Sequence, residues 1–465
     1  MVLDTLIVGA GLSGLSTALS LAQQPQSLLV AEQRDRVGGN ITSVEQDGFI
    51  WEEGPTSFQP VPTLLELALA LGLQDELVFA DAKLPRYVYW QGRLRPVPMS
   101  PLAALTTTLL SPVGKLRALA GALGFVPPAA AGEETVADFF RRHLGAEVAQ
   151  RLVAPFVSGV YAGDPQRLSA IAAFRRVVQL EAAGGGLLAG ALRARQTAPK
   201  LVFPAELPRP PRGALGSFRQ GIGMLPQAIA AKLGDRLRLQ WQLQQIAVTP
   251  QQTYQALFAT PTGPQTLESR SLVLSLPAHT IAELLRPLQP SASQALAAIP
   301  YPPVACVVLA YPDAAIARPL TGFGHLVPRG QGIRTLGTIW SSSLFPGRAP
   351  AGWQVLTSFI GGATDPEIAQ LEPSAIVAAV HEDLRQVLLQ PAAEPKVLAV
   401  HLWSRAIPQY SLGHLTRLAV VEQALSQQPG LFLCSNFSDS VALGDCVRRG
   451  QETAQVVQAY LAAAR

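Results

Sequence analysis

A glycine-rich turn between a buried strand and a helix constrains the fold of this chain more than any other feature. An apolar run at residues 3–8 leads into the turn Gly9-Ala10-Gly11-Leu12-Ser13-Gly14, and a second apolar run ends at Glu32. Gly9 permits a tight turn, Gly11 lets a pyrophosphate approach the backbone, and Gly14 lets the helix pack closely on the strand. The helix N-terminus favours phosphate charge, and Glu32 lies where a ribose-binding carboxylate is expected. The pattern predicts an adenine dinucleotide site in a Rossmann-like α/β domain, with a purely structural glycine turn as the alternative.

Two loops that follow indicate which dinucleotide is bound. Gln33 and Arg34 lead from the acid into Val37-Gly38-Gly39-Asn40, where an NAD site usually begins another helix. The second loop, Gly54-Pro55-Thr56-Ser57, is built around a glycine and a rigid proline. Glycine pairs permit close backbone approach to the far side of a diphosphate. The combined pattern resembles the flavoprotein amine oxidase superfamily and favours FAD, with two ordinary surface turns as the alternative.

Composition excludes several classes of protein. With 465 residues, 48% hydrophobic and 15% charged, the chain is long enough for two or three globular domains. The net charge of +4 is not gathered into basic runs interleaved with aromatics, so we expect no nucleic-acid partner. Three cysteines are too few and too poorly spaced for a disulfide framework or a zinc site. The six histidines show no metal-ligand spacing, so no metal is expected.

The sequence predicts a cytoplasmic protein without a transmembrane span. The first strand begins almost at Met1, which leaves no room for a targeting segment. The most apolar stretch, residues 99–131, is interrupted by prolines, Lys115 and Arg117. Its helices could lie on a membrane surface, with both basic side chains available to lipid phosphates. A buried helical subdomain or the face of a homodimer is the alternative.

The order of helical and strand patterns predicts an FAD-binding Rossmann-like domain with an inserted α+β substrate domain and a helical subdomain. A helix from about Gly444 closes the chain, and its N-terminus would stabilise negative charge on a reduced flavin. A plain strand and helix that complete the sheet are the alternative. The expected segments are 1–85, 214–250 and 396–465 for FAD binding, 86–213 for the helical subdomain and 251–395 for the substrate domain.

Longer motifs resemble one family, protoporphyrinogen IX oxidase in its plant-plastid and cyanobacterial branch. The matching stretches are residues 36–42, 51–57, 92–98, 155–165, 213–218 and 335–346, so the resemblance covers essentially the whole chain. It implies FAD-dependent, six-electron oxidation of protoporphyrinogen IX to protoporphyrin IX, with oxygen reduced to peroxide. Such chemistry needs positioning and exclusion of water more than a strong base. No acid, base or nucleophile constellation occurs, so no catalytic residue is named.

The resemblance implies a substrate site for a flat, tetrapyrrole macrocycle. Arg86 matches the arginine that pairs with a substrate carboxylate, and a guanidinium suits a propionate. Leu326, Ile339 and Phe359 match the apolar residues that clamp the ring. Gly159 matches a backbone position that faces the substrate. Without the family, Arg86 would be read first as a solvated surface arginine, and ordinary strand core would explain the three apolar residues equally well.

The resemblance also implies the flavin contacts. Leu243 would bind the adenine through its backbone. One departure is that Cys434-Ser435 precede Asn436 where the family commonly has glycines. The implied contacts are Gly9, Ala10, Gly11, Leu12, Ser13, Gly14, Glu32, Gln33, Arg34, Gly38, Gly39, Asn40, Gly54, Pro55, Thr56, Ser57, Leu243, Trp403, Asn436, Val441, Ala442 and Leu443.

Other functions stay open at this point. A coproporphyrinogen III oxidase would need more basic residues for four carboxylates, and Arg93 and Arg95 could supply them. A flavin amine oxidase would need an aromatic residue in the final helix region, which residues 438–459 lack. A carotenoid desaturase or a non-enzymatic flavin scaffold would share the cofactor site but not the substrate.

Overall fold

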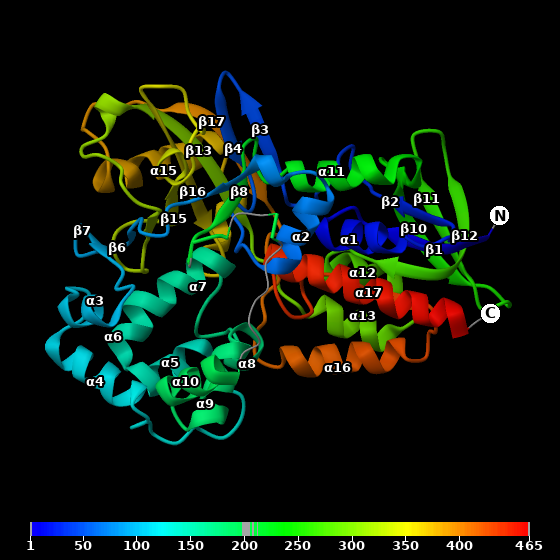
Figure 1. The fold of residues 1–465 in the computed structure, drawn as a ribbon, viewed down its shortest axis with the longest axis horizontal. Helices are drawn as coiled ribbons and strands as arrows, with labels where there is room; N and C mark the ends of the chain where they lie inside the picture. The colour runs from blue at the N-terminus through cyan, green and yellow to red at the C-terminus, as the bar shows by residue number, and fades with distance from the viewer. Residues whose placement is uncertain (1, 198–204, 207–208, 212, 464–465) are drawn as a thin grey trace.

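The computed structural model describes residues 2–197, 205–206, 209–211 and 213–463, and shows two large sheets and a helical lobe (Figure 1). The first sheet has the order β10-β11-β12-β1-β2-β9, and β18 pairs with β12. Its central strand β1 pairs in parallel with both β2 and β12. Its strands are β1 (Val2–Val8), β2 (Leu28–Ala31), β9 (Leu237–Arg238), β10 (Gln242–Val248), β11 (Tyr254–Ala259), β12 (Gln265–Leu274) and β18 (Leu431–Leu433).

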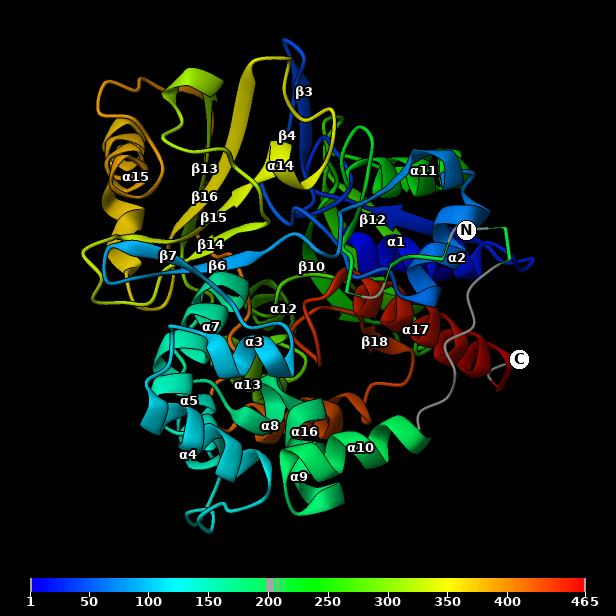
Figure 2. The same ribbon diagram turned by 60° about the vertical axis from the view of Figure 1, so that its left-hand side comes forward.

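Helices cover both faces of the first sheet. One core lies between the sheet and α1, α2, α11 and α17, and a second lies against α12, α13 and α16. Figure 2 shows α1 and α17, from opposite ends of the chain, side by side. These helices are α1 (Leu12–Leu21), α2 (Pro62–Ala70), α11 (Met224–Leu233), α12 (Ala278–Leu285), α13 (Pro290–Ala297), α16 (His414–Leu425) and α17 (Leu443–Ala463).

The second sheet has the order β17-β13-β16-β15-β14-β6-β7. Strand β13, second from one edge, is buried almost throughout, because α15 covers one face and Phe49 and Trp51 of β4 pack on the other. Its elements are β6 (Arg86–Trp90), β7 (Arg93–Pro96), β13 (Val304–Pro312), β14 (Gly324–Leu326), β15 (Thr335–Trp340), α14 (Ser341–Leu344), β16 (Trp353–Gly361), α15 (Pro373–Val387) and β17 (Lys396–Trp403). Two small antiparallel sheets remain: the hairpin of β3 (Ser43–Gln46) with β4 (Phe49–Glu52), and the pair of β5 (Leu77–Phe79) with β8 (Gly216–Phe218).

The helical lobe lies below the second sheet in Figure 1 and has its own apolar core. Across the part of the chain that the structure describes, no helix is long and apolar enough to cross a membrane. The lobe contains α3 (Pro101–Thr106), α4 (Pro112–Ala122), α5 (Val136–Leu144), α6 (Ala146–Val148), α7 (Ala154–Tyr161), α8 (Ala170–Ala173), α9 (Arg175–Gly184) and α10 (Leu187–Thr197). Short 3₁₀ or π turns occupy Gln74–Glu76, Ala149–Val153, Gly234–Arg236, Asp313–Ala315 and Pro366–Gln370.

The α/β fold class predicted from the sequence is confirmed, but strand pairing departs from three expected segment boundaries. Strands β6 and β7, expected in the helical subdomain, join the second sheet, as does β17, expected in the FAD-binding part. Strands β11 and β12, expected in the substrate domain, join the first sheet because β12 pairs with β1. Strand alternation predicts a strand but not its partner. Residues 198–204, 207–208 and 212 of the expected 86–213 segment lie outside the described residues.

The packing of α17 on α1 predicts a cost for any side chain at Gly450. A Cβ there would lie 2.6 Å from the Ser13 carbonyl oxygen and 2.9 Å from the Thr17 nitrogen. We expect Gly450→Ala to lower the free energy of unfolding by about 1–3 kcal/mol, because the two helices must separate. Urea denaturation measures this change. The exposed Gln455→Ala in the same helix is the control, and equal stability of the two variants would contradict the packing argument.

Candidate functional site

The turn between β1 and α1 leaves an open backbone surface at the start of the helix. Gly9 has φ +103°, and a Cβ there would overlap the Ser275 carbonyl oxygen, so only glycine fits. A Cβ on Gly14 would overlap the Gly9 carbonyl oxygen. At Gly11, by contrast, a Cβ would meet no described atom within 4 Å. Gly11 begins α1 without a side-chain cap from the described residues, so the helix N-terminus is available to a phosphate group.

Glu32 ties the glycine turn to the loop that follows β2. Its carboxylate is buried and accepts the N–H of Ala10 at 2.8 Å and that of Arg34 at 2.9 Å. The Glu32 carboxylate, which we predict to bind a ribose, is therefore already bonded to two backbone N–H groups. Each oxygen keeps a second lone pair for a hydroxyl. Leu243 of β10 lies near this point, because the N–H of Trp241 donates to the Glu32 carbonyl at 2.8 Å.

Three loops that are separate in sequence meet beside the glycine turn. The N–H of Gly38 donates to the Ala10 carbonyl at 2.8 Å. A Cβ on Gly39 would lie 3.3 Å from the Gly11 Cα, and one on Gly54 would overlap the Asn40 carbonyl oxygen. The predicted cofactor segments 9–14, 38–40 and 54–57 are thus held together by close backbone contact.

Trp403, at the end of β17, connects these loops to the second sheet. Its indole N–H donates to the Glu53 carbonyl at 2.7 Å. The Arg34 guanidinium lies 5.6 Å from the Trp403 ring centre and donates to the Gly39 carbonyl at 2.7 Å. The hydrogen bond to His401 is the main cause that lowers the pKa of the Glu53 carboxyl below its usual range. Arg34 and Trp403 therefore position the loops through stacking and main-chain contacts.

The C-terminal predictions lie at the start of α17. Asn436, Val441, Ala442 and Leu443 lie between β18 and the first turn of α17, which packs on α1. The buried Arg449 of α17 pairs with Asp439 in this connection. Segments from both ends of the chain therefore converge on one region, as expected.

The predicted substrate residues lie on one face of the second sheet. Cross-strand pairing aligns Arg86 with Gly324, and Gly324 with Ile339. The neighbouring row aligns Leu326 with Gly337, and Gly337 with Phe359. Residues two apart on a strand share a face, so all four side chains belong to the same face.

Helix α7 meets this face at Gly159. A Cβ on Gly159 would overlap the Leu326 Cδ2, so the glycine allows the helix to approach the apolar side chain. The resemblance implies that Gly159 faces the substrate, and the structure adds that a side chain at this position would collide with Leu326. A substitution here therefore moves a predicted wall residue.

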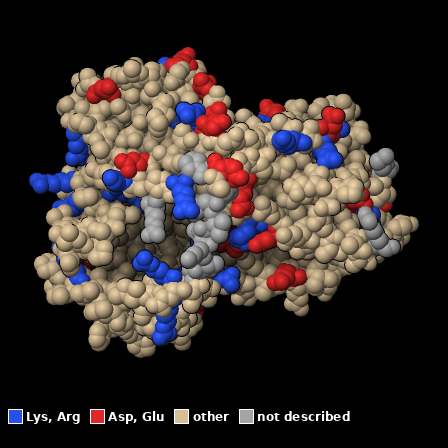
Figure 3. All heavy atoms as spheres, in the orientation of Figure 1, with Lys and Arg blue, Asp and Glu red and all other residues tan. Residues whose placement is uncertain are grey.

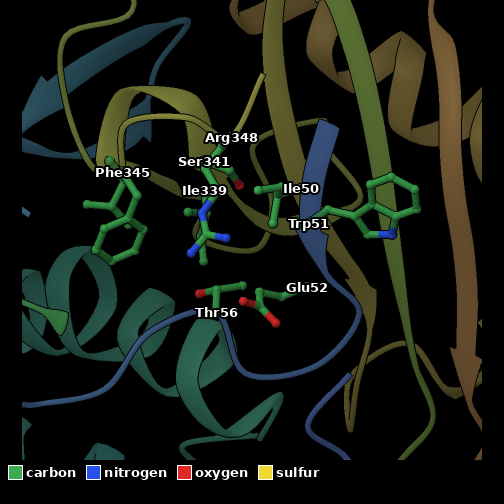
Figure 4. A pocket seen from close by; sticks show the side chains of 9 residues that line it. Ile50, Trp51, Glu52, Thr56, Ile339, Ser341, Phe345 and Arg348 are labelled. Atoms are coloured by element: carbon green, nitrogen blue, oxygen red, sulfur yellow. The ribbon is translucent and has the colours of Figure 1, made fainter. Parts of the chain in front are cut away.

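A small cavity joins the cofactor loop to the substrate face (Figure 4). Thr56 lines it from the loop, and Ile339 lines it from β15. Glu52 and Arg348 also face it, and sequence analysis assigned neither to the site. No local pattern could have paired them, because they come from β4 and from the segment after α14. The one feature of the sequence that could have drawn attention to Glu52 is its position at the end of an apolar strand.

Arg86 is a half-buried cation without a carboxylate partner among the described residues. Its guanidinium lies 5.4 Å from the Phe323 ring centre and donates to the Gly213 carbonyl at 3.4 Å. Figure 3 shows a hollow between the lobes with basic side chains at its rim. No cluster of metal-binding side chains occurs within the described ranges. The arrangement suits an apolar ligand that carries a carboxylate.

Comparison with known proteins decides the family. The family described as flavin containing amine oxidoreductase matches residues 12–458. This chain belongs to that family. The match implies a flavin cofactor, and the open helix N-terminus at Gly11 fits its phosphate groups. The resemblance to protoporphyrinogen oxidases is also confirmed by relatives covering nearly the whole chain.

The chloroplastic protoporphyrinogen oxidase of Nicotiana tabacum is 46% identical, over 99% of this chain and 86% of that protein. The coproporphyrinogen III oxidase of Bacillus subtilis (strain 168) is 28% identical, over 98% of each chain. A crystal structure from Exiguobacterium sp. 255-15, provisionally assigned as a protoporphyrinogen oxidase, has TM-score 0.79 at 23% identity. It covers 98% of both chains and shows the shared fold.

The contact between the loops at Gly54 predicts a loss of flavin on substitution. We expect Gly54→Ala to release most of the flavin during purification, because the new methyl group displaces the Asn40 loop. The ratio of flavin to protein absorbance measures retention. Gly263→Ala, at an open hairpin tip, is the control. Full flavin retention by Gly54→Ala would contradict the loop arrangement.

Proposed function

We propose that this protein is an FAD-dependent oxidase that converts protoporphyrinogen IX to protoporphyrin IX in heme and chlorophyll biosynthesis, with O2 as acceptor and H2O2 as product. The observation that carries the proposal is the shared sheet face of Arg86, Leu326, Ile339 and Phe359 beside the cofactor loops. The chloroplastic protoporphyrinogen oxidases of Nicotiana tabacum and Arabidopsis thaliana are 46% and 45% identical to this chain, against 28% for a coproporphyrinogen III oxidase and 29% for a mitochondrial protoporphyrinogen oxidase.

The side chains act by binding and orienting the macrocycle. Arg86 would pair with a propionate at the edge of the sheet. Leu326, Ile339 and Phe359 would pack on the ring face and exclude water from the reacting carbon. A bound flavin would supply the electron acceptor for each oxidation step. Each oxidation would remove a hydride to the flavin and a proton to solvent, and we assign no protein acid or base because Leu326, Ile339 and Phe359 carry no ionisable group.

The contacts of Arg95 favour protoporphyrinogen IX, which has fewer carboxylates than coproporphyrinogen III. Its guanidinium donates to the carbonyls of Trp90 at 3.4 Å and Thr108 at 2.9 Å. A side chain engaged in this way is poorly placed to bind additional carboxylates of coproporphyrinogen III. Porphyrin fluorescence after addition of each porphyrinogen tests the choice. Faster oxidation of coproporphyrinogen III than of protoporphyrinogen IX would contradict the proposed substrate.

The role of Arg86 predicts a change in substrate affinity. We expect Arg86→Ala to raise the KM for protoporphyrinogen IX by about 10-fold or more, through loss of a charged hydrogen bond, with flavin content unchanged. Arg86→Lys should recover part of this loss. The exposed Arg93→Ala is the control and should behave as wild type. An unchanged KM for Arg86→Ala would contradict the assigned contact.

We further propose that α3 and α4 rest on a membrane surface. Exposed side chains include Leu102 at 72%, Val113 at 75% and Leu116 at 67%. Exposed large apolar side chains gathered on two neighbouring segments of the chain are typical of an interaction site. One part of the sequence argument is wrong: Arg117 is not available to lipid phosphates. Its guanidinium donates to the carbonyls of Arg142 and His143 at the end of α5.

Liposome flotation tests the membrane proposal. We expect wild-type protein to float with vesicles of phosphatidylglycerol and phosphatidylcholine, and Leu102→Glu/Leu116→Glu to stay in the soluble layer, because charge opposes insertion. Val456→Glu, at an exposed site on α17, is the control. Wild-type protein that stays wholly soluble would contradict membrane binding. A dimer that the double variant dissociates would instead assign this surface to the homodimer.

A further inference from the structure

Two buried charged side chains face the cavity that joins the cofactor loop to the substrate face (Figure 4). Glu52 ends β4 and is 4% exposed, and Arg348 follows α14 and is 3% exposed. Thr56 and Ile339 line the same cavity, so the two charges lie beside the junction of the proposed flavin and macrocycle sites. Isolated charges are costly to bury, so this position requires an explanation.

Donors at the start of α11 stabilise the Glu52 carboxylate. One oxygen accepts the Ile222 N–H at 2.9 Å, and the other accepts the Ser43 hydroxyl at 2.5 Å. The same hydroxyl accepts the Gly223 N–H at 2.8 Å. The N-terminal end of a helix favours negative charge. These contacts fix the position of the carboxylate beside the cavity.

Arg348 is only partly satisfied. Its Nη2 donates to the Ser217 hydroxyl at 2.7 Å and to the Phe218 carbonyl at 3.0 Å. Its Nη1 is buried without a hydrogen-bond partner among the described residues. No direct ion pair joins Arg348 to Glu52, although both are described. The cavity between them has about 10 Å³, close to the space that one water molecule needs.

We propose that Glu52, Arg348 and a bridging water form a charge pair that sets the redox potential of the flavin. The inference rests on the proposed flavin and macrocycle sites. Reduction of a bound flavin would add negative charge, which the Arg348 cation would stabilise and the Glu52 carboxylate would oppose. The effect is strong because burial removes the screening that water provides. Glu52 and Arg348 act on the flavin only through their charges, and neither side chain reacts with the substrate.

The ionisation of Glu52 makes this effect depend on pH. Burial raises the pKa of Glu52 to about 7, although bonds to Ser43 and Ile222 and the charge of Arg348 oppose the rise. The Cys306 thiol of β13 also lies near Glu52, and burial raises its pKa, so the thiol stays neutral. Below about pH 7 the pair is therefore positive, and above it the pair becomes neutral.

Anaerobic redox titration of the bound flavin tests the proposal in the purified holoenzyme. Wild type, Glu52→Gln, Arg348→Gln and Arg348→Lys are compared at about pH 6 and about pH 8. Asp383→Asn is the matched control, because Asp383 is also buried, accepts two backbone N–H groups and has a raised pKa. Thermal unfolding of each variant separates a change in stability from a change in potential.

We expect Glu52→Gln to raise the potential at pH 8 and leave it unchanged at pH 6, since the wild-type carboxyl is already neutral there. Arg348→Gln should lower the potential at both pH values, and Arg348→Lys should restore it. Asp383→Asn should match wild type. Wild-type potentials in Glu52→Gln and Arg348→Gln at both pH values, with only stability altered, would overturn the proposal. The titration uses no porphyrinogen, so inactivity toward that substrate contradicts the proposed function without altering this result.

Discussion

Close backbone contact among three loops is the constraint on which the rest of the structure depends. Gly54 approaches the Asn40 carbonyl with no space for a side chain, and a Cβ on Gly39 would lie in tight contact, 3.3 Å from the Gly11 Cα. The contacts hold the start of α1 open toward a phosphate group and place Thr56 opposite Ile339. A small movement of the loops would separate the cofactor region from the substrate face. The glycines therefore determine how the cofactor region lies against the substrate face, in addition to the geometry of the turn itself.

The second sheet depends on this contact for its function. Its apolar face and Arg86 could bind many ligands that combine a ring with a carboxylate. Trp403 and the Glu53 carbonyl fasten that sheet to the loops, and α7 closes on it at Gly159. Chemistry on a macrocycle needs such positioning, because the cofactor supplies the reactivity and the protein supplies orientation.

Sequence predicted the local parts of this arrangement well and the contacts between distant segments poorly. The turn at residues 9–14 and the strand of Glu32 follow from short patterns of apolar residues and glycine. The pairing of β12 with β1, of β6 with β14 and of β17 with β13 is not encoded in strand alternation, so the sheets cross three of the expected segment boundaries. The substrate residues came from resemblance, because an arginine or leucine has no distinctive local pattern. Glu52 and Arg348 were missed because only the folded chain brings them together.

The most direct test of the central claim is anaerobic mixing of the purified protein with protoporphyrinogen IX in a stopped-flow spectrometer. If loops from both ends of the chain hold a flavin against the apolar face of the second sheet, its yellow absorbance bleaches rapidly as porphyrin forms, and oxygen restores it. A protein that retains flavin yet shows no bleaching with this substrate would contradict the account.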